Sequence, residues 1–303
     1  MKTTKYYIAA ITAYTIWGFF SLVLKPIHEY ASLDILFFRV FSCSILMLLI
    51  AFAFKSKKVQ ETIETFRALS TSGKRKTILL NIGGSFFLMA NWFTFIYVMN
   101  HISVKATSLA YLVCPILTTL LAYFILHEKL KKTQWLAVGL SISGCLLLSY
   151  ADIMDMFFSI IIGFTYACYL VSQRVNKGFD TFIILTFHIT LAALFLAPFY
   201  PFYSGPVPTT VTFYFCIEMI AVFFTIIPLF LNLYALSGIN SSTVGMLLNI
   251  NPMIAFALAN FIYKEKITPL QITAYGIIFI AVLVFNSHHL FAMKQKRIVS
   301  AKN

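Results

Sequence analysis

Residues 101–148 read HISVKATSLAYLVCPILTTLLAYFILHEKLKKTQWLAVGLSISGCLLL, and a related sequence occupies residues 238–285, 137 positions further along the chain. The two stretches align without a gap. Identical positions include Pro115 with Pro252, Glu128 and Lys129 with Glu265 and Lys266, Gln134 with Gln271, and Gly139 with Gly276. Apolar chains match by composition alone, but Pro, Glu and Gln are scarce here. The agreement therefore indicates an internal repeat, which is the first guide to the fold.

The composition predicts an integral membrane protein. Of 303 residues, 60% are hydrophobic and only 11% are charged, whereas a soluble domain carries about 25% charged residues. The five cysteines lie inside apolar runs and never form a CxxC pair, so we interpret them as small apolar residues, neither disulfides nor metal ligands. The sequence has no P-loop, HExxH or GxSxG motif. We therefore expect no cofactor, no metal and no catalytic residue.

Ten runs are long enough to cross a membrane as helices, because a crossing needs roughly 20 mainly apolar residues. They lie at about 6–24, 34–54, 77–99, 104–126, 134–150, 153–172, 181–203, 210–235, 241–262 and 268–287. The sequence thus predicts an all-α integral membrane protein with ten transmembrane helices.

The distribution of Lys and Arg predicts the orientation. With the N-terminus in the cytoplasm and alternating crossings, 18 of the 23 Lys and Arg residues fall on the cytoplasmic side and four on the outer side. Both termini are then cytoplasmic, and we expect a multi-pass protein of the inner (plasma) membrane. The net charge of +13 is thereby explained as a topology signal, with the lipid bilayer as the partner and no nucleic acid.

The two repeat copies begin five crossings apart, so they are expected to have opposite orientations in the membrane. We predict two inverted five-helix repeats, residues 1–150 and 151–287, followed by a basic cytoplasmic tail at 288–303 that is unstructured from Lys294 onward. A cytoplasmic linker at 55–76 is predicted to hold a short amphipathic helix at the membrane surface. Inverted repeats are typical of secondary transporters, which bind their substrate near mid-membrane at the repeat interface. Alternating access is the mechanism that this symmetry favours.

Ionisable residues inside predicted spans are candidates for function, because a charge at a helix centre costs about 2.5–3.5 kcal/mol on insertion scales. Arg39 lies within the second span and could contact an anionic group of a substrate. Glu218, in the eighth span, could take up a coupling proton. The alternatives are that Arg39 pairs with Asp34 near the outer face, and that Glu218 lies close to an interface.

Pro115 and Pro252 occupy equivalent positions in the two repeats. A proline inside a spanning helix bends it and frees a backbone carbonyl one turn earlier, which is tolerated where the helix faces protein or a watery cavity. We predict two related bends lining one central cavity, although packing alone also explains prolines. Further candidates for the cavity wall are polar or aromatic residues of the spans: Asn91, Asn249 and Asn251, together with Trp17, Tyr97, Tyr111 and Tyr166.

Several motifs resemble the drug/metabolite transporter superfamily. They are Ala13-Tyr14-Thr15-Ile16-Trp17-Gly18, the spacing of Asp34 and Arg39, Asn91-Trp92, Asn100-His101, Ser108-Leu109-Ala110-Tyr111 before Pro115, and His127-Glu128-Lys129 before Gln134-Trp135. Within the superfamily the chain is most similar to the EamA-type ten-helix permeases, and among these to the RarD-like subgroup. The resemblance covers nearly the whole chain and is strongest in the first five spans. Glu218 matches no motif of the family.

The resemblance implies two inverted five-helix repeats, cytoplasmic termini, and small organic metabolites or drugs as substrates. We therefore predict a secondary transporter that moves such solutes by alternating access. A membrane-embedded enzyme or lipid-handling scaffold is the alternative, which the repeat and the missing catalytic motifs disfavour. Which solute, which coupling ion, which direction and which oligomeric state are questions that the sequence leaves open.

Overall fold

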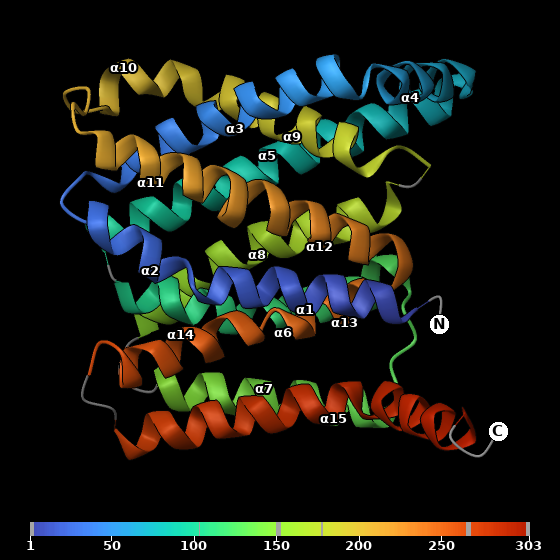
Figure 1. The fold of residues 1–303 in the computed structure, drawn as a ribbon. Helices are drawn as coiled ribbons and strands as arrows, with labels where there is room; N and C mark the ends of the chain where they lie inside the picture. Colours follow the sequence, from blue (N-terminus) through green and yellow to red (C-terminus); the bar gives the residue numbers. More distant parts are fainter. Residues whose placement is uncertain (1–2, 103, 150–152, 177, 265–267, 301–303) are drawn as a thin grey trace.

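The computed structural model describes the chain except for residues 1–2, 103, 150–152, 177, 265–267 and 301–303 (Figure 1). Every regular element of the described residues is a helix. The first half contains α1 (Thr4–Gly18), α2 (Phe20–Leu24), the short 3-10 helix η1 (Lys25–Ile27), α3 (Ser32–Phe54), α4 (Ser56–Ala68), α5 (Thr71–His101), α6 (Val104–Leu126) and α7 (Lys132–Ser149).

The second half begins with α8 (Ile153–Val175) and α9 (Thr181–Leu196), which continues through η2 (Ala197–Phe199) into α10 (Tyr200–Tyr203). The remaining elements are α11 (Val211–Ala221), η3 (Val222–Ile226), α12 (Ile227–Gly238), α13 (Ser241–Leu247), α14 (Ile250–Phe261) and α15 (Pro269–Ser300). Instead of ending before the predicted unstructured tail, α15 continues as a helix to Ser300. A membrane helix can extend into water wherever its next residues, such as Lys294 and Gln295, have good helix propensity.

Nine stretches of the described chain are long and apolar enough to cross a membrane, and they coincide with nine of the ten predicted runs. The run predicted at 134–150 forms α7, which is only 18 residues long and begins with polar Lys132 and Gln134. The outer surface of the bundle is apolar, as Leu49 (61% exposed), Phe52 (66%) and Phe215 (65%) illustrate. Such a surface suits hydrocarbon and would be poorly solvated by water. The protein is a multi-pass membrane protein.

Several helix contacts recur when the elements of the two halves are exchanged. Helix α6 packs on α8 as α14 packs on α1, and α5 packs on α8 as α12 packs on α1. Three further contacts join equivalent helices, namely α3 with α9, α6 with α13, and α7 with α15. The pair α7 and α15 forms one edge of the bundle, while α1, α6, α8 and α12 lie at its middle (Figure 1).

The backbone repeats its conformation at the ends of α6 and α14. His127 has φ 52° and Lys264 has φ 53°, a left-handed conformation that is uncommon for residues other than Gly, Asn and Asp. The two residues are 137 positions apart, the spacing of the sequence repeat. The copies differ further inside the membrane, since α6 runs through Pro115 without a break, whereas α13 and α14 are separated at Leu248 and Asn249, before Pro252.

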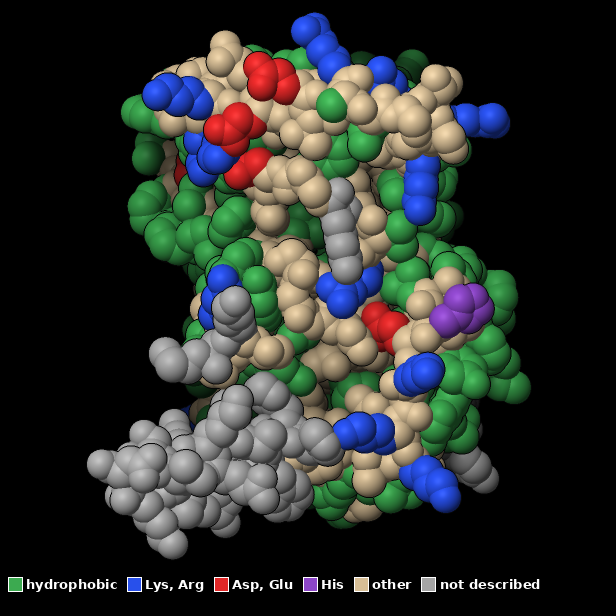
Figure 2. Space-filling model, turned by 90° about the vertical axis from the view of Figure 1, so that its right-hand side faces the viewer, with side chains coloured by type: hydrophobic (Ala, Val, Ile, Leu, Met, Phe, Trp, Pro, Cys, Tyr) green, Lys and Arg blue, Asp and Glu red, His purple; other side chains and the backbone are tan. Residues whose placement is uncertain are grey.

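The predicted linker contains the amphipathic helix α4, which has no buried residue. Lys58 and Glu61 form the salt bridge of this helix, and the hydrogen bond from Lys58 to Glu61 raises the pKa of Lys58. The first and last described turns of the chain lie at the same end of the bundle as α4 (Figure 1). Figure 2 views that end directly and shows Lys and Arg side chains scattered over it.

Candidate functional site

Arg39 is an arginine inside the bundle that forms no salt bridge with the described residues. Its guanidinium carbon lies 5.0 Å from the ring centroid of Trp92 on α5, and it interacts electrostatically with Tyr111 on α6. The Nε atom is buried and has no hydrogen-bond partner in the described structure. The alternative partner considered from sequence, Asp34, instead accepts a hydrogen bond of 3.0 Å from the Gly205 amide. Cation–π contact with Trp92 leaves N–H groups available for an anion.

A second polar group lies between α1, α8 and α12. The Tyr14 hydroxyl donates to Asn232 Oδ1 at 2.8 Å, and Asn232 Nδ2 donates to the Tyr166 hydroxyl at 3.0 Å. All three side chains are buried. The Trp17 ring contacts both tyrosines, at 5.8 Å from Tyr14 and 6.2 Å from Tyr166 between ring centroids. The structure thus brings the candidates Trp17 and Tyr166 together around Asn232 and Tyr14.

Trp17 also compensates for a break in the helix opposite. Pro228 has no N–H, so the Phe224 carbonyl loses its usual partner four residues later, and the backbone widens into the π-helical turn η3. The Trp17 indole N–H donates to that carbonyl at 2.7 Å. Thr225 donates likewise to the Ile220 carbonyl and Cys43 to the Ala221 carbonyl. The indole therefore fixes the middle of the span formed by α11, η3 and α12.

Other predicted wall residues have separate environments. Asn91 Nδ2 donates to the Ile162 carbonyl at 2.9 Å and joins α5 to α8. Tyr97 is 47% exposed and stacks on His101, away from the polar groups above. Glu218 is exposed on the same face of α11 as Phe215, and its carboxylate accepts a 2.6 Å hydrogen bond from Ser42. These three residues are not brought together.

Two spans carry the prolines, α6 with Pro115 and the pair α13 and α14 with Pro252, and they meet directly on one side of these residues. Pro115 and Pro252 are both buried, and beyond them α6 packs closely on α13 at Thr118 and Gly245. Asn249 is fully buried at the break; its Nδ2 donates to the Met246 carbonyl, while its Oδ1 has no partner in the described chain. Asn251 is also buried. The predicted cavity between the two bends stays a prediction.

The Glu-Lys motif joins the two halves at the end of the bundle that carries α4. The Glu128 carboxylate, just beyond α6, accepts hydrogen bonds from the Ser241 amide at 2.8 Å, the Ser242 amide at 3.1 Å and the Ser242 hydroxyl at 2.6 Å. An acidic side chain is well placed at the first turn of a helix. Its repeat equivalents, Glu265 and Lys266, lie outside the described residues.

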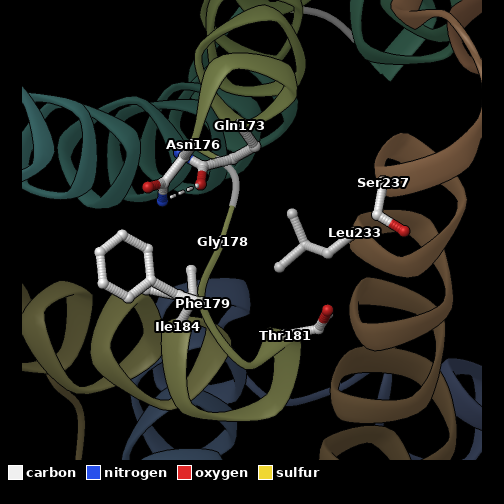
Figure 3. Close-up of a pocket in the computed structure, with 8 residues that line it drawn as sticks. All are labelled: Gln173, Asn176, Gly178, Phe179, Thr181, Ile184, Leu233 and Ser237. Carbon is white, nitrogen blue, oxygen red and sulfur yellow. Dashed lines mark hydrogen bonds between the residues drawn. The ribbon is translucent and has the colours of Figure 1, made fainter. Parts of the chain in front are cut away.

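His188 is a buried polar residue that was not among the residues predicted from sequence. It lies on α9 and is fully buried, with Nε2 3.0 Å from Asn81 Oδ1 of α5 and Nδ1 3.5 Å from the Tyr169 hydroxyl of α8. The sequence did contain a signal for His188, because this residue interrupts the apolar run 181–203. A titratable residue inside a span suggests a functional site. Near it, Gln173 and Asn176 line a cavity of about 210 Å³ between the start of α9 and α12 (Figure 3).

Among the described residues, no group of three His, Cys, Asp or Glu side chains is arranged to hold a metal ion. The five cysteines are free, and four of them are buried.

Comparison with known proteins identifies the family. The model of the EamA-like transporter family matches twice, at residues 4–150 and 153–287. The uncharacterized transporter YojE of Bacillus subtilis is 25% identical over 94% of both chains. RarD of Salmonella typhimurium is 25% identical over 97% of this chain and 99% of its own length, and RarD of Escherichia coli is 24% identical over 94% of each.

A solved crystal structure superposes on the fold with a TM-score of 0.72 at 12% identity, covering 93% of this chain and 96% of that one. At this identity the likeness concerns the fold alone. The family matches and the full-length RarD relatives support the resemblance drawn from the motifs. The chain therefore belongs to the EamA-like transporter family, as an EamA-type permease of the drug/metabolite transporter superfamily with RarD-like character.

Proposed function

We propose that the protein is a secondary transporter that moves a small organic solute by alternating access between two inverted five-helix repeats. The two family matches, at 4–150 and 153–287, support repeats bounded near residue 150. The exchangeable helix packing and the repeated left-handed residues His127 and Lys264 support their equivalence. With α7 as a membrane crossing, the count is ten and the second repeat is inverted. Two related halves then supply two related gates.

In the proposed orientation the protein lies in the inner (plasma) membrane, with both termini in the cytoplasm. The Lys and Arg side chains gathered at the end with the first and last described turns support it (Figure 2). Glu128 then closes a cytoplasmic contact between α6 and α13. Residues 204–209, between α10 and α11, would face outside.

The observation that carries the substrate proposal is the Arg39 guanidinium, held against Trp92 with Nε unpaired among the described groups. An unpaired charge in an apolar bundle is unfavourable, so its retention favours a ligand that neutralises it. A carboxylate or phosphate would accept hydrogen bonds from the guanidinium, while Trp92 and Tyr111 would enclose the organic part. We propose a small organic anion, or a metabolite bearing one anionic group, as the substrate.

The test is flux from proteoliposomes loaded with a mixture of small anionic metabolites and followed by mass spectrometry. We expect at least one solute to leave vesicles holding the wild-type protein. With Arg39→Ala we expect release at least about tenfold slower than with the wild type, because a charged hydrogen bond contributes about 1.5–3 kcal/mol. The control is Arg67→Ala, which removes an arginine from the exposed helix α4 and should leave the flux unchanged.

Unchanged flux in Arg39→Ala would contradict the anion site while leaving transport intact. Glu218→Gln is measured in parallel, because its exposed carboxyl was the other ionisable candidate. We expect it to retain flux, since its carboxylate is bonded to Ser42 on the outer surface of the bundle. Accumulation of altered lipids in place of solute movement would favour a membrane enzyme or lipid-handling scaffold.

A further inference from the structure

His188 lies in a polar site inside the membrane that is shaped to hold it. It is the eighth residue of the span 181–203, about 10 Å from its start at 1.5 Å per residue. Its ring is fully buried and meets α5 through Asn81 and α8 through Tyr169. Gly84 makes room for the neighbouring Gln173, since a Cβ there would overlap Gln173 Nε2, while its 3.5 Å distance from His188 Nε2 is an ordinary contact. Residues of α5 and α8 therefore surround the imidazole that α9 carries.

The hydrogen bonds define which ring nitrogen is free to bind a proton. Asn81 Nδ2 donates to the Thr77 carbonyl at 2.8 Å, which leaves Asn81 Oδ1 facing the ring as an acceptor. Nε2 must then carry a hydrogen, so in the neutral ring Nδ1 holds the lone pair, next to the Tyr169 hydroxyl. That hydroxyl can donate to neutral Nδ1 or accept from a protonated one. The site consequently satisfies both charge states of His188.

The site is connected to the cavity at the cytoplasmic end. Asn176 Nδ2 donates to Asn81 Oδ1 at 2.9 Å and to Gln173 Oε1 at 3.1 Å, and both Gln173 and Asn176 line the cavity. Figure 3 shows their hydrogen bond at one wall, opposite Leu233 and Ser237 of α12. Polar side chains thus lead from a cavity of about 210 Å³ to the imidazole.

On its other side the site touches the centre of the bundle. Tyr169 stacks on Tyr166 with ring centroids 5.9 Å apart, and Tyr166 accepts the hydrogen bond from Asn232. Asn232 in turn holds Tyr14 of α1. A change in charge at His188 would therefore act on α5 and α8 directly, and through Tyr169 on the contact between α8, α12 and α1.

Among the described residues, no charged group competes for the ring. From α8 the Tyr169 hydroxyl faces it, and α5 presents the Asn81 amide and Gly84. The titratable groups on the other packed helices have partners of their own. On α3, Arg39 lies over Trp92 and Cys43 donates to the Ala221 carbonyl, and just beyond α3 Lys55 lies over Phe182. On α4, Lys58 pairs with Glu61, and on α12, Tyr234 contacts Tyr6. Protonation of His188 would thus add an unopposed positive charge.

We propose that His188 is the proton-binding site of the transporter, with Nδ1 as the proton acceptor, and that proton binding is coupled to the rearrangement of the helices around the ring. Nδ1 faces the Tyr169 hydroxyl, on the side away from the Asn81 contact that leads to the cavity, so a movement of these helices must first admit water to it. A hydronium ion then gives its proton to Nδ1, forming the Nδ1–H bond, and leaves as water. The added charge favours a more hydrated arrangement of α5, α8 and α9. This inference rests on the proposed transport function, and it assigns the coupling proton to His188 in place of Glu218.

The direct test is nitrogen NMR of ¹⁵N-histidine-labelled protein in nanodiscs, which needs no transported solute. Among the signals of the six histidines, the one missing in His188→Gln belongs to His188. Because a fully buried ring with no charged partner favours its neutral form, we expect the change to the protonated form only between about pH 6 and pH 4. His28→Gln is the control, because His28 is exposed and its ring bonds to the nearby Lys25 carbonyl. A His188 signal that stays neutral down to about pH 4 would overturn the proposal.

A flux measurement separates coupling from a structural role. With a solute identified in the proteoliposome assay, we expect an imposed pH gradient to drive wild-type and His28→Gln uptake several-fold above the uptake measured without a gradient. His188→Gln should move the solute down its own gradient but lose the response to pH. A variant that keeps the full pH response would refute coupling through His188. If the wild-type protein moves no solute at all, the transport proposal fails, while the NMR result still shows whether His188 binds a proton.

Discussion

At the scale of single residues, a buried asparagine side chain that joins helices has different hydrogen-bond partners from one that bonds only within its own helix. Asn232 holds the hydroxyls of Tyr14 and Tyr166, both buried. Asn286 on α15 is also buried, but its Nδ2 donates to the Val282 carbonyl of its own helix and its Oδ1 has no partner among the described residues. The same substitution at the two sites should therefore have different consequences.

We expect Asn232→Leu to destabilise the protein by about 1–3 kcal/mol, because it leaves two buried hydroxyls without their partner. Asn286→Leu should be neutral or slightly stabilising, because it removes an unpaired buried oxygen. Thermal unfolding in detergent, followed by circular dichroism, compares the two variants with the wild type. Equal losses of melting temperature in both would contradict the network around Asn232.

Prediction of single residues from sequence could use the cost of placing a charge in the membrane, but it could not use the geometry of the fold. Arg39 was recognisable because a charge in a span is rare, and its role in substrate binding stays a prediction. His188 carried the same kind of signal, but only the fold brings it to Asn81 and Tyr169. The expectation that Trp17 lines a cavity stays a prediction, and the fold adds that its indole N–H donates to the Phe224 carbonyl that Pro228 leaves free. No sequence pattern links residues 17 and 224.

At the scale of elements, α6 and α13 meet at a contact that leaves no room for a side chain. A Cβ on Gly245 would lie 2.7 Å from both Cβ and Cγ2 of Thr118, which is closer than carbon atoms approach. Gly139 on α7 is in contrast exposed, and a Cβ there would meet nothing within 4 Å. The two positions form a matched pair of helical glycines.

Gly245→Ala should reduce stability by about 1–3 kcal/mol, because it forces α6 and α13 apart. Gly139→Ala should leave stability unchanged or raise it by about 0.5–1 kcal/mol through better helix propensity. The loss of folded protein on heating, measured by size-exclusion chromatography, distinguishes these results. Comparable stability of Gly245→Ala and the wild type would mean that the α6–α13 contact is looser than described.

Helix positions were largely predictable, because the apolar length of a span is a property of sequence alone. The interruptions within these helices were harder to predict. Bends were predicted at Pro115 and Pro252; the helix is interrupted just before Pro252, yet Pro115 lies in a continuous helix. The π-helical turn before Pro228 was not predicted. The first span divides at Phe19, between α1 and α2, without any proline at that position. Whether a helix bends depends on its neighbours as well as on its own residues.

At the scale of the whole molecule, the contacts between the two halves determine what can move. One such contact lies at the end that carries α4, which is cytoplasmic in the proposed orientation, and is made by Glu128 from the first half and by Ser241 and Ser242 from the second. If the halves alternate, this contact must open in every cycle. Holding it closed with a covalent bond should stop transport without removing the binding site.

The most direct measurement is solute flux through a Glu128→Cys, Ser242→Cys double variant in proteoliposomes, before and after oxidation. The account predicts that the reduced double variant and both single variants release solute, that oxidation stops release only in the double variant, and that dithiothreitol restores it. Mass spectrometry confirms that the two introduced thiols have formed a disulfide with each other. Undiminished flux through the fully crosslinked protein would contradict alternating access between the two halves.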